Sequence, residues 1–184
     1  MSNNNKTIIS VLILILAAVG VYYLIINQGQ TQMSAVSSFE ECAATGNPVM
    51  ESYPRRCQYQ GSTFTEDIGN ELEKADLIRI ENPRPNQIIK SPLLISGEAR
   101  GSWFFEASFP VVLVNWDELI IAQGIATAEG EWMTSEFVPF TATLTFTADK
   151  SAYSDKGTLI LRKDNASGLP EHDDALEVPV IFAK

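Results

Sequence analysis

The sequence feature that most constrains the fold is an uncharged apolar run near the amino terminus, IISVLILILAAVGVYYLII at residues 8–26. As an α-helix this run would extend about 29 Å, close to the ~30 Å hydrocarbon thickness of a bilayer. A helix inside a soluble domain is rarely apolar on every face. The run therefore predicts one transmembrane helix in contact with membrane lipid, preceded by a short tail at residues 1–7.

The charges on either side of this run predict its orientation. Lys6 is the only charged side chain before Asn27, and the chain carries a net charge of −10, so the part after the run carries −11. Because short positive flanks stay in the cytoplasm, we expect a single-pass protein of the cell membrane with a cytoplasmic amino terminus and an extracytoplasmic carboxy-terminal part. The alternative is a secretory signal cleaved near the small residues AAVG, although the apolar run continues beyond them. The acidic balance argues against nucleic acid as a partner.

The segment after the run contains the two cysteines of the chain. Residues 27–38 are polar and unpatterned, which predicts a flexible linker, and Cys42 and Cys57 follow within residues 39–67. So short a segment buries little core, and on the oxidising side of a membrane a disulfide would stabilise it. A redox pair usually has CxxC spacing, and a zinc site needs about four ligands. We therefore interpret the two cysteines as a structural disulfide.

Local signals predict the structure within this small module. Ser38 followed by Glu41 resembles a capping box, which predicts a short helix from Phe39 to Thr45 that ends at Gly46. Two extended pieces are expected around a turn at a further glycine, at residues 56–60 and 63–66.

After a second, charged linker at residues 68–76, strand periodicity extends over residues 77–184. The clearest signal is TATLTFT at residues 141–147, where threonines alternate with apolar residues. Short strands separated by glycine, proline, asparagine and aspartate predict an all-β, immunoglobulin-like β-sandwich. Gly97 and Gly101 are expected at bends, and Pro179 at an edge or a bulge. We expect the strands at residues 77–81, 88–89 with 93–95, 109–114, 118–126, 131–138, 141–147, 157–162 and 176–182.

Three stretches of this β region carry a family resemblance: SPLLISGEARG, WFFEASFPV and GTLILRKDNASG. With their surroundings, from Leu77 to Phe182, they resemble the immunoglobulin-like domain of bacterial spore germination (the Gmad family). The resemblance implies a bacterial, envelope-associated domain that acts in binding or assembly and not in catalysis. No partner module of the germination arrangement accompanies it, so a role in sporulation is not carried over. The stretch EECAATGNPVMESYPRRC resembles a short cysteine-pair module of prokaryotic secreted and envelope proteins, which carries no known activity.

The densest candidate site is the stretch RGSWFFE at residues 100–106. One interpretation is a ligand face for a glycan or an extended peptide, formed by Arg100, Trp103, Phe105 and Glu106, with Trp116 as a further exposed aromatic. The other is that alternate aromatics enter the core and that Glu106 pairs with a cation or with backbone amides.

No catalytic, cofactor or metal constellation emerges from the remaining residues. The loop from Asp164 to Asp174 offers oxygen atoms but lacks the ligand spacing of a calcium loop, which favours a solvated turn. His172 is the single histidine and has no recognisable nucleophile motif beside it. The pairs Glu40–Glu41 and Glu71/Glu73 lie in a helix cap and a linker, with no sign of a glycosidase site.

These observations favour a non-catalytic, membrane-anchored envelope protein whose outer domain binds or scaffolds an envelope protein or glycan. Two alternatives stay open. One is an unrecognised carbohydrate-active hydrolase. The other is a structural spacer that oligomerises through an exposed edge strand beside Pro179.

Overall fold

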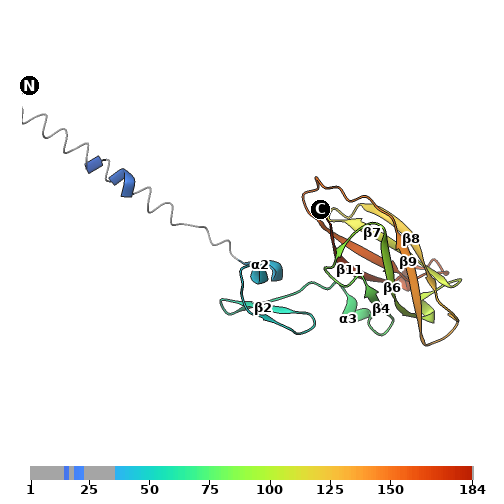
Figure 1. The fold of residues 1–184 in the computed structure, drawn as a ribbon. Coiled ribbons are helices and arrows are strands. Elements are labelled where there is room, and N and C mark those ends of the chain that lie inside the picture. Colours follow the sequence, from blue (N-terminus) through green and yellow to red (C-terminus); the bar gives the residue numbers. More distant parts are fainter. Residues whose placement is uncertain (1–14, 17–18, 23–35, 184) are drawn as a thin grey trace, which may run out of the picture.

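The computed structural model describes residues 15–16, 19–22 and 36–183 (Figure 1). Most of the expected transmembrane helix, the tail at residues 1–7 and residues 27–35 of the linker lie outside the described residues. The described residues within the apolar run, 15–16 and 19–22, are helical. Across the described part of the chain, no helix is both long enough and apolar enough to span a membrane. The membrane anchor therefore stays a prediction.

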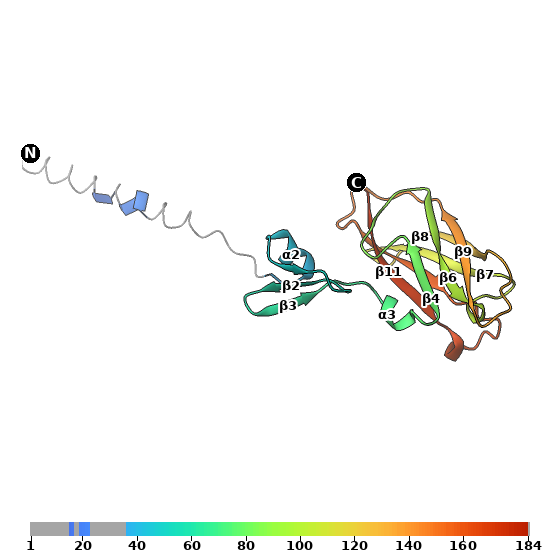
Figure 2. The same ribbon diagram turned by 60° about the horizontal axis from the view of Figure 1, so that its bottom comes forward.

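The small module consists of one helix and an antiparallel sheet in the order β1-β2-β3, at one end of the larger sheet (Figure 2). As predicted, Ser38 caps the helix, because its side-chain oxygen accepts from the amide of Glu41 at 3.1 Å. The Glu41 carboxylate accepts from the amide and hydroxyl of Ser37. The elements are α2 (Phe39–Ala44), β1 (Val49–Met50), β2 (Arg56–Tyr59) and β3 (Ser62–Thr65). The sequence did not indicate β1.

The larger part is one eight-stranded sheet in the order β4-β6-β9-β8-β7-β10-β11-β5. Its strands are β4 (Ile78–Asn82), β5 (Ile88–Ile89), β6 (Leu93–Arg100), β7 (Ser108–Asn115), β8 (Ile120–Ala128), β9 (Phe137–Leu144), β10 (Lys156–Arg162) and β11 (Ala175–Phe182). Helix α3 (Glu71–Lys74) precedes it, and 3-10 turns lie at Gly101–Trp103 and Pro170–His172. Neighbouring strands are antiparallel except β11 and β5, which are parallel.

The sheet curls, so that its two halves pack face to face instead of forming two separate sheets. Strands β8 and β9 share only the pairs Thr127↔Thr141 and Ala128↔Phe140, which is where the sheet folds over. Across the interior, the ring of Phe109 on β7 meets that of Phe140 on β9 edge-on at 4.9 Å. The all-β prediction is confirmed, and the predicted sandwich of separate sheets is replaced by one curled sheet.

Two local predictions in this region are wrong. Residues 131–136 form a loop, and the following strand begins only at Phe137. Gly97 lies within β6, where a Cβ would come within 2.2 Å of the Arg79 carbonyl oxygen. The glycine therefore permits close approach of β4 and does not bend the strand. Along β9 the predicted alternation is confirmed, with Ala142 and Leu144 buried and Thr143 exposed.

The expected linker at residues 68–76 is docked on strand β11. Asn70 donates from its side chain to the Ala175 carbonyl at 2.9 Å and accepts from the Glu177 amide at 2.8 Å. Gly69 has φ +65°, and a Cβ there would lie 1.9 Å from the Glu177 carbonyl oxygen, so only glycine fits. Ile68 is buried. A charged, unpatterned sequence thus covers the edge of a strand instead of forming a free linker.

The same edge explains Pro179. Beyond Asn70, β5 pairs with β11 only at Ile181 and Phe182. Pro179 lies between these contacts, and its carbonyl accepts from the Asn86 amide at 2.7 Å. Because no strand continues along this side at residue 179, the missing N–H of proline costs no ladder hydrogen bond.

Candidate ligand-binding groove

The residues proposed as a ligand face are not assembled on one surface. Trp103 is 1% exposed and belongs to the main core, so it cannot offer its ring to a ligand; its indole N–H has no hydrogen-bond partner among the described residues. Phe105 and Trp116 are each 44% exposed, but they lie before and after β7. A strand of that length spans about 26 Å, so the two rings lie at opposite ends of the sheet.

Arg100 and Glu106 also have structural surroundings. The Arg100 guanidinium stacks on the ring of Phe137 at 4.0 Å and donates to the Asp76 and Ser135 carbonyls. Glu106 has φ +50° in the turn that leads into β7. Ligand binding by Phe105, Glu106 or Trp116 is left as a prediction, but the continuous aromatic platform is not formed.

A different aromatic pair is exposed on this domain. The rings of Trp116 and Tyr153 lie 5.7 Å apart between centroids, and Tyr153 is 92% exposed. Trp116 is held in a turn in which the Asn115 side chain accepts from the amides of Asp117 and Leu119. Tyr153 lies in the loop between β9 and β10. The loop and the turn meet because Asn115 pairs with Gly157 in the β7–β10 register.

Sequence reasoning missed Tyr153 because the contact depends on which strands are neighbours. Within its loop, Asp149 accepts hydrogen bonds from the hydroxyl and amide of Ser151, which lower the pKa of Asp149. These bonds form a local turn just before Tyr153. No periodic pattern marks such a loop, and nothing in the sequence pairs residue 116 with residue 153.

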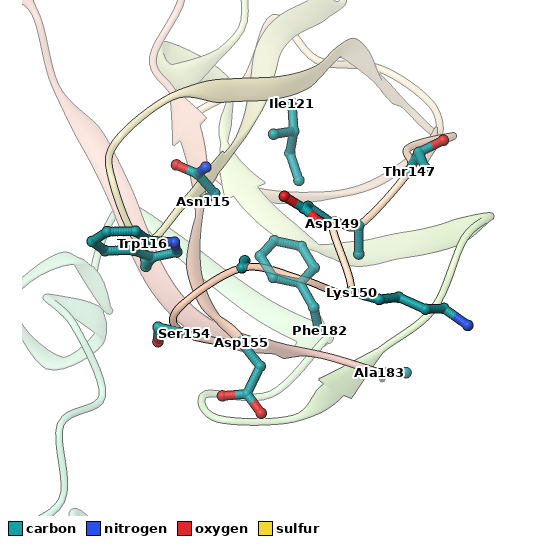
Figure 3. Close-up of a pocket in the computed structure, with 12 residues that line it drawn as sticks. Asn115, Trp116, Ile121, Thr147, Asp149, Lys150, Ser154, Asp155, Phe182 and Ala183 are labelled. Carbon is teal, nitrogen blue, oxygen red and sulfur yellow. The ribbon is translucent and has the colours of Figure 1, made fainter.

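Two hollows adjoin Trp116. On one side is a largely apolar cavity of ≈ 80 Å³, toward which Trp116, Ile121 and Phe182 point (Figure 3). On the other side is an open groove of ≈ 420 Å³ that also borders Tyr153. Pockets for ligands of moderate size are usually ~300–1,000 Å³, so the groove is the more suitable of the two. We call it the Trp116 groove.

Both parts of the structure line the Trp116 groove. Glu40 and Asp67 come from the small module and its exit, whereas Trp116, Glu118 and Tyr153 come from the larger sheet. A weak ion pair crosses the groove, with the Lys156 ammonium 3.7 Å from the Glu40 carboxylate. The shape of the groove therefore depends on how the small module is held against the sheet.

An ionic joint holds it. Within the small module, Arg55 binds the Glu66 carboxylate through two nitrogens, at 2.8 Å and 2.5 Å, and the Asn86 side chain from the turn between β4 and β5 donates to the same carboxylate at 3.4 Å. The Glu71 carboxylate is 2.8 Å from Arg84, in the turn between β4 and β5, and also accepts from the Tyr53 hydroxyl. Both carboxylates are buried. Since a buried charge is costly without a partner, the contacts that cross from one part to the other, Tyr53 to Glu71 and Asn86 to Glu66, favour one orientation of the module.

A family model, the immunoglobulin-like domain of bacterial spore germination, matches residues 77–168, half of the chain. The chain belongs to this family. The resemblance expected from the sequence is thus confirmed, over a shorter range that runs from β4 to the loop after β10. No curated protein and no solved structure matches the chain significantly.

Membership of this family bears on whether the other candidate residues, such as His172, take part in catalysis. This family of immunoglobulin-like domains is not known as a catalytic one. The Nδ1 atom of His172 is hydrogen-bonded to the Ser167 hydroxyl at 3.0 Å. The Asn165 side-chain amide donates to the Asp173 carboxylate at 2.7 Å. These contacts tie the loop of the immunoglobulin-like domain to itself.

Among the described residues, no group of three histidine, cysteine or acidic side chains is arranged to hold a metal.

The ionic joint predicts a pH dependence. The Arg55 side-chain hydrogen bonds hold the pKa of Glu66 below its ordinary value of 4.5, although burial opposes this shift. Because the folded-state pKa is depressed, the stabilisation from Glu66 is present above pH 4.5 and is lost as the pH falls through the lower, folded value. Burial and the hydrogen bond to Glu71 raise the pKa of Tyr53 to about 12, so Tyr53 stays a donor to Glu71 throughout this range.

Carboxyl-carbon NMR titration of the full-length chain checks this prediction. The Glu66 signal should titrate with a midpoint below 4.5, and Arg55→Ala should raise that midpoint, because burial is then opposed only by the hydrogen bonds from the residue-55 amide and Asn86. Glu66→Gln should remove the corresponding loss of stability in acid. An unchanged midpoint in Arg55→Ala would show that Arg55 does not hold this carboxylate in solution.

Proposed function

We propose that this protein is a non-catalytic module, anchored in the cell membrane, whose extracytoplasmic immunoglobulin-like domain binds or scaffolds another component of the bacterial envelope. The observation that carries the proposal is the Trp116–Tyr153 pair beside the Trp116 groove. Large exposed aromatic rings next to a concave surface are typical of binding sites, and tryptophan and tyrosine are enriched among the residues that dominate binding energy.

The cellular location is supported by two independent features. The uncharged run at residues 8–26 has the length of a bilayer-spanning helix, and its short positive flank favours a cytoplasmic amino terminus. The disulfide between Cys42 and Cys57 fits an oxidising compartment, where such bonds form and persist. Together they support projection of the acidic part away from the cytoplasm.

The alternatives have less support. The buried carboxylates Glu66 and Glu71 are each engaged by an arginine, which does not favour a pair of hydrolytic acids. The edge beside Pro179, which a spacer would use to oligomerise, is occupied by Asn70 and Asn86.

A capture experiment tests the proposed function. The full-length protein in detergent, immobilised through a carboxy-terminal tag, is incubated with solubilised envelope proteins and with released cell-wall glycans. We expect specific capture that falls by at least tenfold in the double variant Trp116→Ala/Tyr153→Ala, since each interfacial aromatic of this kind contributes about 2 kcal/mol.

The matched control is Met133→Ala. Met133 is more exposed than Trp116 but lies in the loop before β9 and does not line the groove, so its loss should leave capture unchanged. Equal capture by the wild type and the double variant would contradict binding at the Trp116 groove. Circular dichroism of each variant verifies that the fold is kept.

A further inference from the structure

The charge of the Trp116 groove indicates the class of ligand. Resting on the proposed function, we propose that this groove binds a positively charged, extended segment of a partner protein through its lysine or arginine side chains. The proposal depends on three features: the aromatic pair, the charges that line the groove, and the rigid contribution of the small module.

The aromatic pair suits a cation. An ammonium or guanidinium within about 6 Å of a ring centroid is attracted to the face of the ring, most strongly to tryptophan. Trp116 and Tyr153 are both exposed beside the groove. The protein already uses this contact internally, since Arg79 and Arg100 both stack on Phe137, at 4.1 Å and 4.0 Å.

The charged side chains that line the groove are predominantly acidic. They are Glu40, Asp67 and Glu118 against the single ammonium of Lys156, which lies beside Glu40. No hydrogen bond or ion pair from the Glu118 side chain is found among the described residues. The groove thus combines an aromatic wall with a net negative charge, which attracts cations and repels anionic polymers.

The groove, with a volume of ≈ 420 Å³, also has room for more than one side chain. It runs from Glu40 of the small module, past Lys156, to the Trp116 turn of the sheet. At the ionic joint, Tyr53 of the small module bonds to Glu71 and Arg84, and these contacts hold the two walls in one orientation. An extended basic segment would place one cation over the rings and a second between the module and the sheet. A neutral glycan would use the aromatic wall but would leave the carboxylates of Asp67 and Glu118 without a charged partner.

Calorimetric titration of the full-length protein with hexalysine tests the ligand class. The protein is kept in an uncharged polyoxyethylene detergent that has no sugar or choline headgroup. We expect saturable binding that weakens with salt, falls about tenfold in Trp116→Ala/Tyr153→Ala, and falls severalfold in Glu118→Gln. The matched charge control is Glu171→Gln, an exposed acid in the turn at Pro170–His172, which should bind as the wild type does.

Hexalysine acetylated on every side chain, and a neutral chitin tetrasaccharide, complete the experiment. The acetylated peptide should not bind. Equal binding of both peptides, or binding of hexalysine that neither groove variant weakens, would overturn the cationic class. Binding of the tetrasaccharide that is lost in the aromatic double variant would also overturn it while leaving the proposed function intact. If envelope capture is also insensitive to the double variant, the proposed function fails as well.

Discussion

Replacing Cys42 with serine should unfold the small module while the eight-stranded sheet stays folded. The buried core of the module consists of Phe39, Cys42 and Cys57, with a few partly buried neighbours around it. The two cysteines are bonded across a sequence separation of 15 residues. Closing a loop of that length stabilises by roughly 3 kcal/mol on the chain-entropy model, and so small a core supplies little more than that.

Hydrogen exchange measured by mass spectrometry on the full-length protein checks this expectation. Amides in β2 and β3, which pair from Arg56↔Thr65 to Tyr59↔Ser62, should lose their protection, whereas β7 and β10 should keep theirs. Val49→Ala, a truncation of a half-exposed side chain in the same module, should change protection little. Retained protection of β2 in Cys42→Ser would mean that the ionic joint alone can hold the module together.

Truncation of Phe140 should produce the largest loss of stability in the sheet domain. Phe140 is buried on β9, where its ring packs edge-on against Phe109 and lies over Gly97. Phenylalanine-to-alanine changes in such positions cost about 3–5 kcal/mol, because the transfer free energy is lost and a cavity is left between the two halves of the curled sheet. In a domain of this size, that corresponds to a fall in Tm of roughly 15 °C or more.

Urea unfolding followed by tryptophan fluorescence measures the effect. Trp103 is buried in the same core and should report its unfolding. Leu94→Ala on β6 removes an exposed side chain and serves as the control, with an expected loss below about 1 kcal/mol. If Phe140→Ala lost no more stability than Leu94→Ala, the two halves of the sheet would not depend on this contact.

Local signals predicted local structure well. The alternation of residues 141–147 identified the second half of β9, residues 141–144, because a strand with one buried face needs period two. Ser38 was identified as a helix cap because its oxygen satisfies an amide that the helix leaves free. The disulfide was predicted because only two cysteines were available in a segment too short to fold on core burial alone.

The features that the sequence did not show depend on pairing between segments that are far apart in the chain. Trp103 and Phe105 are close in the sequence, yet one ring is buried and the other is exposed, and Trp116 is carried to the far end of β7. The contact between Trp116 and Tyr153 depends on the pairing of β7 with β10. Likewise, residues 68–76 resemble a linker because their partner, β11, lies about a hundred residues later in the chain.

The attachment of Asn70 to β11 has a mechanical consequence. Force applied at the amino-terminal side travels along the backbone and reaches Asn70 before it reaches β4. There it is passed to β11 through the contacts with Ala175 and Glu177, assisted by the Lys74–Asp174 bridge at 2.6 Å. Strand β11 pairs with β10 from Lys156↔Ile181 to Arg162↔Ala175. The applied force is therefore distributed over the backbone hydrogen bonds along the whole length of this pair. The terminal strand β4 is thereby spared from being peeled off first when the amino-terminal side is pulled.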